Sequence, residues 1–387
     1  DLSDGQNAQV TQTASQEGYL SNKVTLNNLQ PGVTYYYQVT GKEIESFTTD
    51  DDTSDFSFIF VGDPQIGSSN SAKDDSPEDM QTPEFLTAQS EAVRNDSFNW
   101  NYTLNRAFAK TGNSANFILS AGDQIQTNYE DAEDTRISEI EYAGYLSPDV
   151  MKSVPVATTV GNHDADNPNY TYHFNIANMS DLGDNGYVGG DYYFTYGDAL
   201  FMILNTQDTN VSEHKQFIEE TVAANQDCKW RIVTLHQDIY GSAEHSNEPE
   251  ITNLRYSLVP IFEENDVDIV LTGHDHAYSR TKMLQGGQST TGFEYTDDEF
   301  DEQLDKDVDV GDSTETIYEA PANISDDTTD PAEQRYLEYL YSVMDEDAVL
   351  ELTDNQDVAI DSAGIMYLTA GSSSGSKYYD LVPRQQT

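Results

Sequence analysis

Five short apolar segments recur between residues 56 and 274 and predict the strands of a buried sheet. They read FSFIFVG, ANFILSAG, SVPVATTVG, KWRIVTLH and VDIVLTGH, and each is followed by a loop and then a helical stretch. Strands this apolar leave no face for water, which is typical of a sheet that helices cover on both sides. We therefore expect an α/β fold with a mixed central sheet flanked by helices.

The segments between these strands supply the expected helices and one hairpin. The candidate helices are residues 101–110, 213–224 and 250–264, and Pro249 opens the last of them. DYYFTYG and ALFMILN, at residues 191–205, predict two antiparallel strands. No repeat at a solenoid period is evident.

Residues 1–52 carry a different pattern, which predicts a partial all-β sandwich domain ahead of the main domain at 53–387. A Pro-Gly turn at 31–32 precedes tyrosines at a spacing of two, as in a strand that follows a tight corner. The segment resembles the end of a fibronectin type III domain, and Leu29 and Tyr35 fit its leucine and corner tyrosine. Because such a domain needs about 100 residues, we expect this copy to be truncated at its start. The alternative is an extra hairpin packed on the main domain.

Residues 286–361 form an acidic insertion, which we expect to be a lid that is partly mobile. This stretch holds 24 acidic residues and two basic ones. Within it, DKDVDVG at residues 305–311 has aspartates spaced as in a calcium loop. Its glycine comes one place late and the twelfth position is not glutamate, which argues against an EF-hand and leaves a looser calcium contact open.

The charge of the chain narrows the classes of partner. Seventy acidic residues against 18 basic ones give a net charge of -52, which repels nucleic acid and anionic membrane surfaces. Simple solubility explains such a charge, and so does a salty or calcium-rich extracellular setting. No apolar run reaches the length of a membrane span, and the chain opens at Asp1 without a signal segment. We expect a secreted or cell-surface protein; protein partners and oligomeric state are not indicated.

Side chains that bind metals follow each of the five predicted strands. They are Asp63, Asp123, Asn162, His236, His274 and His276. The carboxyl ends of strands in an α/β sheet meet at one crevice, so these groups should converge there. Carboxylate, amide and imidazole together form a ligand set for two metal ions about 3.5–4 Å apart.

The order GD, GD, GNHD, a strand-terminal histidine and GHDH resembles that of the calcineurin-like metallophosphoesterases, over residues 56–380. With the β-rich segment in front, the chain is most similar to the purple acid phosphatase branch. The resemblance implies a four-layer sandwich and two metal ions, with Fe, Mn or Zn favoured and Ca as an alternative. Asp123 would bridge them; Asp63 and His276 would bind the first. Asn162, His236 and His274 would bind the second.

The same resemblance implies hydrolysis of phosphate monoesters or diesters by a water that bridges the metals. His163 would donate a proton to the leaving oxygen, and Asp164 could hold its imidazole in the required tautomer. His245 lies at about the offset of a substrate-binding histidine in plant-type purple acid phosphatases. A surface-loop histidine is the alternative there.

Two positions depart from the family pattern. Gln126 stands where purple acid phosphatases have the tyrosine whose phenolate colours the ferric site, and Gln65 stands where most other relatives have a histidine. A glutamine carbonyl can coordinate a hard cation but is a weaker ligand than imidazole or phenolate. We therefore include Gln65 among the candidate ligands. We also expect an iron-loaded protein without the purple band, unless Tyr129 supplies a phenolate.

Two other functional classes compete with an enzyme. A degenerate relative could use the fold for cation-dependent adhesion, and the charge alone could serve calcium buffering. Retention of all six first-choice ligands together with His163 favours the enzyme.

Overall fold

The computed structural model describes most of the chain, with gaps. The described residues are 8–15, 19–72, 79–127, 135–166, 168–176, 178–287, 293–307, 321, 323–343, 350–351, 358–360, 362–379 and 381. Among them, no helix has the length and apolar character that a membrane crossing requires.

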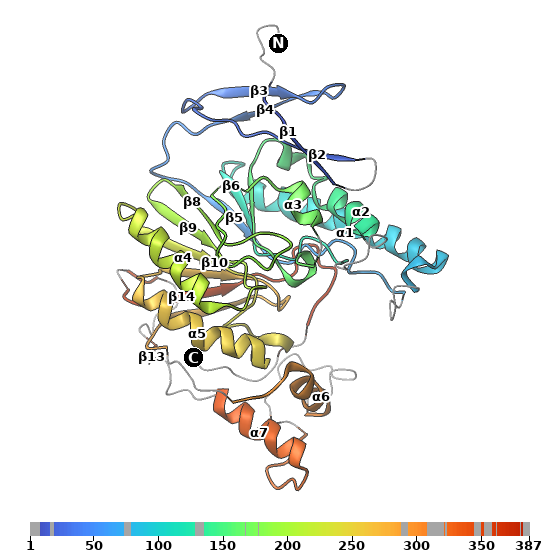
Figure 1. The fold of residues 1–387 in the computed structure, drawn as a ribbon, viewed down its shortest axis with the longest axis vertical. Coiled ribbons are helices and arrows are strands. Elements are labelled where there is room, and N and C mark those ends of the chain that lie inside the picture. Colours follow the sequence, from blue (N-terminus) through green and yellow to red (C-terminus); the bar gives the residue numbers. More distant parts are fainter. Residues whose placement is uncertain are drawn as a thin grey trace.

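The five predicted strands all form, but they divide between two sheets rather than joining one (Figure 1). The first sheet is parallel and has the order β5-β6-β7. Its strands are β5 (Phe58–Val61), β6 (Phe117–Ser120) and β7 (Val156–Thr158).

The second sheet is mixed and has the order β13-β12-β14-β11-β10-β9-β8. Its four central strands β9, β10, β11 and β14 are parallel, and β8 and β12 pair antiparallel to their neighbours. The strands are β8 (Tyr192–Tyr196), β9 (Ala199–Ile203), β10 (Trp230–Thr234), β11 (Ile269–Thr272), β12 (Ser279–Gln285), β13 (Leu350–Glu351) and β14 (Ile365–Thr369). The predicted hairpin is confirmed as β8–β9.

Helices cover the outer faces of the two sheets. The α-helices of this part are α1 (Pro83–Lys110), α2 (Thr135–Tyr145), α3 (Asn169–His173), α4 (Val211–Ala224) and α5 (Pro249–Glu264). The 3-10 helices are η1 (Asp79–Gln81), η2 (Asp149–Lys152), η3 (Asn162–Asp164) and η4 (Glu244–Asn247). The helix predicted at 101–110 is only the second half of α1, whose start is capped by the side chain of Thr82.

Alternate side chains of the strands build a layered core. On β6, Ile118 faces the helices and Leu119 faces the second sheet. The cluster under α1 and α2 includes Trp100, Leu104, Ile118 and Tyr142. The cluster between the sheets includes Phe117, Leu119, Phe201 and Leu271. The cluster under α4 and α5 includes Met202, Phe217, Leu258 and Phe262. This helix, sheet, sheet, helix order is the four-layer arrangement that the sequence led us to expect.

The N-terminal region forms two small antiparallel sheets, β1 (Thr11–Ala14) with β2 (Leu20–Lys23) and β3 (Thr34–Gln38) with β4 (Ile44–Thr48). The hydroxyl of Tyr35 accepts a hydrogen bond from the backbone N–H of Gln30, 2.7 Å away, as a corner tyrosine does. The region packs on the main domain, since Tyr37 donates to the carbonyl of Lys152. Its relation to fibronectin type III and the boundary at residue 52 stay predictions.

The described part of the acidic insertion is a small helical lobe, which we call the α6–α7 lobe. It contains α6 (Asp297–Asp307) and α7 (Pro331–Val343), at the foot of the molecule in Figure 1. An aromatic cluster that includes Phe300, Tyr336 and Tyr339 joins it to Tyr256 of α5. Asp307 is buried and accepts hydrogen bonds from two backbone N–H groups and from Tyr336, so its carboxylate serves the fold here. Residues 308–311 of the candidate calcium loop lie outside the described residues.

Candidate metal centre

The expected ligands meet where the carboxyl ends of the two sheets come together. After β5 the chain pairs at Gly62 with Ser372, which follows β14, and this bridge joins the two edges. Several of the ligands have a left-handed backbone, with φ of 47° at Asp63, 49° at Asp123, 73° at His274 and 49° at His276. Such φ values are uncommon for residues other than glycine and cluster at functional sites, where the surroundings compensate their strain.

One glycine makes the close approach of these loops feasible. Gly122 has φ of 101°, and a Cβ there would lie 2.4 Å from Nδ1 of His236 and 2.9 Å from the backbone nitrogen of Gly161. Any side chain at 122 would therefore separate the loops after β6, β7 and β10.

Two carboxylates are fixed by backbone N–H groups of neighbouring loops. Asp63 accepts from the N–H of His274 at 2.9 and 3.1 Å, and Asp123 accepts from that of His163 at 2.9 Å. Donor atoms of Asp63, Asp123 and His236 all lie within 4.8 Å of one another. These three buried groups form the centre of the site.

Backbone carbonyls set the tautomers of two histidines. Nδ1 of His236 lies 2.7 Å from the carbonyl of Ala121, and Nδ1 of His276 lies 2.9 Å from that of Lys377. A carbonyl only accepts, so each Nδ1 carries a proton and each Nε2 is left toward the centre.

Further expected ligands lie around Nε2 of His236. It lies 3.0 Å from Oδ1 of Asn162, 3.4 Å from Oδ1 of Asp123 and 3.2 Å from Nδ1 of His274. Nε2 of His276 lies 3.7 Å from Oδ1 of Asp63. All six expected ligands thus approach one another.

The candidate ligands have shifted pKa values, and protons would compete with a cation for these side chains. Burial would lower the pKa of His236, but Asp123 and Asp63 raise it to about 9. Burial opposes the charge of Asp123 as well, yet His236 and His163 hold its pKa below the usual range. Burial raises the pKa of Asp63 and lowers that of His276 to about 4. A bound cation would displace the shared protons, so affinity should depend on pH.

The residues present fit metal ions. Two carboxylates, an amide and three imidazoles converge, and this donor set suits Fe, Mn or Zn. Gln65 is fully buried, and neither its amide nitrogen nor its amide oxygen has a hydrogen-bond partner among the described residues. An unpaired buried amide costs free energy, which coordination to a cation by its oxygen would offset.

The structure assigns Asp164 a different role from the expected one. Its carboxylate accepts from the backbone N–H groups of Gly161 and Gln124 and from the hydroxyl of Tyr142. Nδ1 of His163 instead lies 2.6 Å from the carbonyl of Gln126, so this carbonyl fixes the imidazole. The prediction that Asp164 orients His163 is wrong, because backbone N–H groups of the loops after β6 and β7, together with Tyr142, occupy its oxygens.

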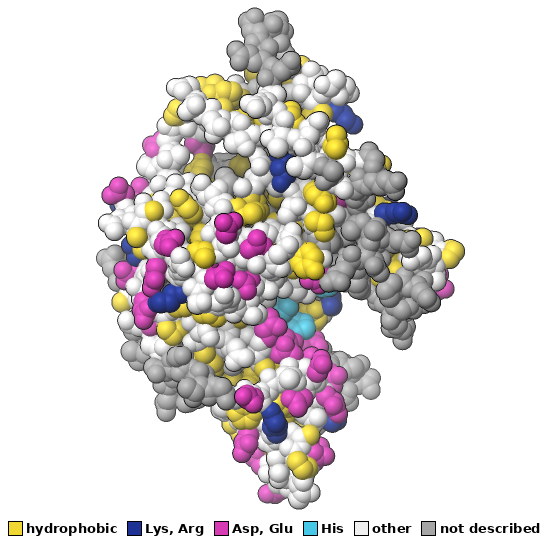
Figure 2. All heavy atoms as spheres, in the orientation of Figure 1, with side chains coloured by type: hydrophobic (Ala, Val, Ile, Leu, Met, Phe, Trp, Pro, Cys, Tyr) yellow, Lys and Arg dark blue, Asp and Glu magenta, His cyan; other side chains and the backbone are white. Residues whose placement is uncertain are grey.

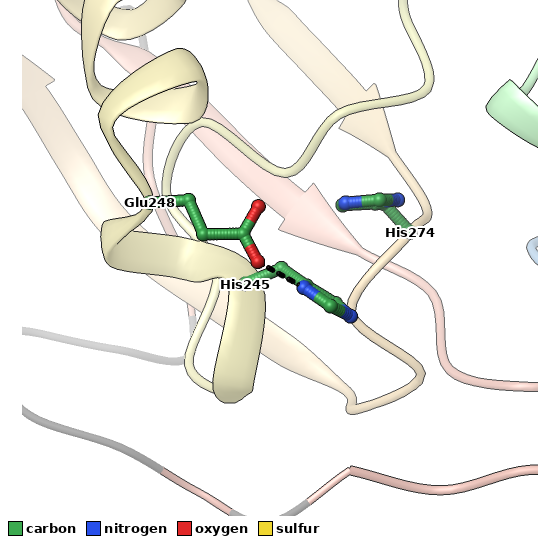
Figure 3. Close-up of side chains that lie close together, drawn as sticks. All are labelled: His245, Glu248 and His274. Carbon is green, nitrogen blue, oxygen red and sulfur yellow. Dashed lines mark hydrogen bonds and ion pairs between the residues drawn. The ribbon is translucent and has the colours of Figure 1, made fainter. Parts of the chain in front are cut away.

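His245 lies beside the centre with a carboxylate of its own (Figure 3). It pairs through Nδ1 with Glu248, and its ring centroid is 4.8 Å from that of His274. Donor atoms of His245, Glu248 and His274 lie within 4.8 Å of one another, a second group that could hold a cation. Asp275 accepts from the N–H of His245 and fixes η4. His245 is therefore not a surface-loop histidine.

The α6–α7 lobe contributes negative charge next to His245. Burial and Glu248 raise the pKa of Asp301 on α6 to about 7. Figure 2 shows histidine atoms at the mouth of a hollow above this lobe, with acidic side chains around them. One side of the centre is therefore strongly acidic.

Sequence reasoning missed Glu248, Asp275, Lys377 and Tyr379. The ring of Tyr379 lies 4.5 Å from that of His245 and 4.7 Å from that of His276, between centroids. Asp275 stands inside the GHDH motif and could have been suspected from it. Lys377 was missed because it follows β14, a strand that does not end in a candidate ligand. The scarcity of lysine in this chain could have drawn attention to it. Tyr129 lies outside the described residues.

Comparisons with known proteins identify one family model and several relatives that match this chain. The model of the calcineurin-like phosphoesterase family matches residues 56–278. Purple acid phosphatase 4 of Arabidopsis thaliana is 27% identical over 198 residues, which are 44% of this chain and 55% of that protein. Purple acid phosphatase 18 of the same plant is 38% identical over 60 residues, 16% of this chain and 14% of that one. The chain thus spans about half the length, or less, of these relatives.

Two phosphatases are among the solved structures that resemble this chain at low identity. A purple acid phosphatase from yellow lupin (Lupinus luteus) seeds has a TM-score of 0.48 and 16% identity, over 94% of this chain and 54% of that one. A dimetal phosphatase from Danio rerio has a TM-score of 0.35 and 14% identity, over 61% of this chain and 89% of that one.

Proposed function

Because this chain belongs to the calcineurin-like phosphoesterase family, whose model matches residues 56–278, we propose that it is a binuclear metal-dependent hydrolase of phosphate esters. The observation that carries the proposal is the convergence of Asp63, Asp123 and His236, with donor atoms within 4.8 Å of one another. The hydrogen bond from His236 to the carbonyl of Ala121 aims its free nitrogen at the same point.

Each candidate ligand has a role in this proposal. Asp123, Asp63 and His276 would hold the first ion, with Gln65 as a weak oxygen ligand. Asn162, His236 and His274 would hold the second ion together with Asp123. Two bound cations would polarise the phosphoryl group and lower the pKa of a water that attacks phosphorus.

His163 serves the leaving oxygen. Its Nδ1 faces the carbonyl of Gln126, so the proton that it can give or share is at Nε2. His245, paired with Glu248, lies on the other side of His274 and would bind the substrate's phosphoryl oxygens. Both assignments rest on position relative to the centre.

The metal and the cellular setting follow from composition. The amide of Gln126 offers no phenolate, so Fe, Mn and Zn are all suitable ions and the iron form should lack the purple charge-transfer band. We infer a secreted or cell-surface enzyme from the charge of -52, which salt or divalent cations would screen.

The test combines metal content with hydrolysis. Protein reconstituted with Mn, Zn or Fe should bind two equivalents and hydrolyse p-nitrophenyl phosphate. Asp123→Ala should lose most of the metal and the activity together, because it removes the shared ligand.

The exposed Asp266→Ala is the matched control, since it removes a carboxylate that lies away from the centre and pairs with Arg231. Asp266→Ala should keep both the metal content and the hydrolytic activity. Two equivalents of metal in Asp123→Ala would contradict the assignment, and metal binding without any hydrolysis would favour a binding protein instead.

A further inference from the structure

A small polar pocket opens next to the metal centre. Its volume is about 150 Å³, and its walls include Gly67, Gln126 and Lys377. Each of these three connects to the site: Gly67 follows Gln65 by two positions, and the carbonyl of Lys377 holds His276. The carbonyl of Gln126 holds His163.

The contact with His163 places the pocket on the leaving-group side. In the proposed function, His163 gives its proton to the departing oxygen, so the group attached to that oxygen must lie near it. Gln126 both fixes this imidazole and lines the pocket. The position that carries a metal-bound tyrosine in purple acid phosphatases is here a pocket wall.

The pocket walls are built from amides and hydroxyls held in place. Asn70 donates to Oε1 of Gln89 at 2.7 Å, and Thr127 donates to the buried Glu141 at 2.7 Å. At Gly67, with φ of 107°, a Cβ would lie 2.5 Å from both Gln89 and Glu141. A volume of 150 Å³ is large enough for a glycerol-sized group, and the amide and hydroxyl groups of the walls suit a hydroxylated group better than an aromatic one.

Lys377 gives the pocket its charge. It is the one basic side chain among the described residues that line the pocket, and it is partly buried. Its ammonium lies 4.7 Å from the ring centroid of Tyr379, and no ion pair of Lys377 occurs among the described residues. Near His245, Glu248 and Asp301 repel anions, while Glu244 lies close enough to Lys377 for their opposite charges to attract.

We propose that this pocket binds the leaving group of the substrate, and that the substrate is a phosphate ester of a small hydroxylated alcohol carrying a second anionic group, which Lys377 binds. This inference rests on the proposed function. Hydroxyls of the alcohol would exchange hydrogen bonds with the amide walls, and its anion would pair with Lys377.

Esters matched in size and differing in charge test the substrate class. The panel is 2-phosphoglycerate, glycerol 2-phosphate and phosphoethanolamine, with p-nitrophenyl phosphate as the simple reference. The wild-type kcat/KM should be highest for the anionic ester and lowest for the cationic one. Lys377→Gln should reduce the ratio of the first to the last by about tenfold or more, the usual effect of a lost charged hydrogen bond.

Two further variants test whether the change in the kcat/KM ratio is specific to the positive charge at position 377. Lys377→Arg should restore most of the preference, because it returns the positive charge. Lys229→Gln removes an equally charged residue at the amino end of β10, where it pairs with Asp198, and should leave the ratio unchanged. An unchanged ratio in Lys377→Gln, or an equal change in Lys229→Gln, would overturn the proposal.

A binding measurement needs no hydrolysis and so distinguishes the two proposals. Saturation-transfer NMR should detect glycerate on the wild-type protein and not on Lys377→Gln, and should not detect ethanolamine. Failure of every ester to react would contradict the proposed function alone. Absence of glycerate binding while p-nitrophenyl phosphate is hydrolysed would contradict the pocket alone.

Discussion

The imidazole of His163 is held in its orientation by the carbonyl of Gln126, which lies 2.6 Å from Nδ1. His163 is not among the proposed metal ligands. His163→Ala should therefore keep the metal content and lower kcat by about two to four orders of magnitude, the usual contribution of a positioned acid. The loss should be larger for glycerol 2-phosphate than for p-nitrophenyl phosphate, whose leaving group needs less help from a proton. Loss of metal and activity in equal measure would show that His163 is itself a ligand.

A second histidine predicts how stability depends on pH. His214 is fully buried, with Nδ1 2.8 Å from Asp191 and Nε2 2.8 Å from the carbonyl of Asp208. Burial lowers the pKa of His214, but Asp191 outweighs it and the pKa is raised; burial also raises the pKa of Asp191. Both groups bind protons more tightly in the folded protein than in the unfolded one.

The raised pKa of His214 determines how the unfolding free energy changes with pH. The stabilisation from His214 is complete below its unfolded pKa of about 6.5 and is lost as pH rises through the higher folded value. The unfolding free energy should therefore fall above pH 6.5, and His214→Gln should flatten that fall in urea titrations at several pH values. His173→Gln, which alters a more exposed histidine, should keep the slope. A slope unchanged in His214→Gln would contradict the assignment.

At the scale of elements, the α6–α7 lobe offers a matched pair of tyrosines on one helix. Tyr336 is buried and donates to Asp307, whereas Tyr341 is exposed and donates to Asp326. Tyr336→Phe should destabilise the lobe by about 1–3 kcal/mol, because it leaves a buried carboxylate short of a donor. Tyr341→Phe should change little. Hydrogen exchange of the α6 and α7 amides measures the effect, and equal protection in the two variants would contradict it.

The strands were predictable from sequence because each is an apolar run that stops at a glycine or a ligand. Asp63 and His274 lie 211 residues apart in the chain, yet strand ends alone indicated that they meet. The first half of α1 was missed because Gln89 and Asp96 occupy buried positions in its apolar stripe. They are buried there since Gln89 contacts Glu141 and Asp96 accepts from the N–H of Gly67, partners that no local pattern reveals.

The role of Asp164 could not be predicted for the same reason. It depends on which backbone N–H groups lie nearby in the folded chain, as the contacts of Asp164 with Gly161 and Gln124 show. Motifs identify the residue types that chemistry needs. They do not identify the neighbours that hold them, such as Gln126 beside His163 or Asp275 beside His245.

For the whole molecule, the net charge of -52 predicts a dependence of stability on salt. Ion pairs of lysine and arginine in the described residues involve Lys152, Lys215, Lys229, Arg231 and Lys306. Most carboxylates therefore repel one another through solvent, over a Debye length of about 30 Å at 0.01 M salt and about 3 Å at 1 M. The melting temperature should rise with NaCl across this range.

The control for this prediction is an uncharged osmolyte at equal osmolality, which screens nothing. It should raise the melting temperature less than NaCl does. A melting temperature that falls as NaCl increases would show that attraction between charges, rather than repulsion, dominates the folded surface.

The meeting of two sheets at the metal centre also determines when in the life of the chain a metal can be acquired. Asp63, Asp123 and Asn162 follow strands of the first sheet, and His236, His274 and His276 follow strands of the second. During synthesis, the candidate ligands of the amino-terminal half leave the ribosome first and offer only oxygen atoms, which bind transition metals weakly. A complete site exists only after residue 276 has folded back onto the loop at residue 63. In the proposed function, the ion would therefore be acquired in the compartment in which folding is completed.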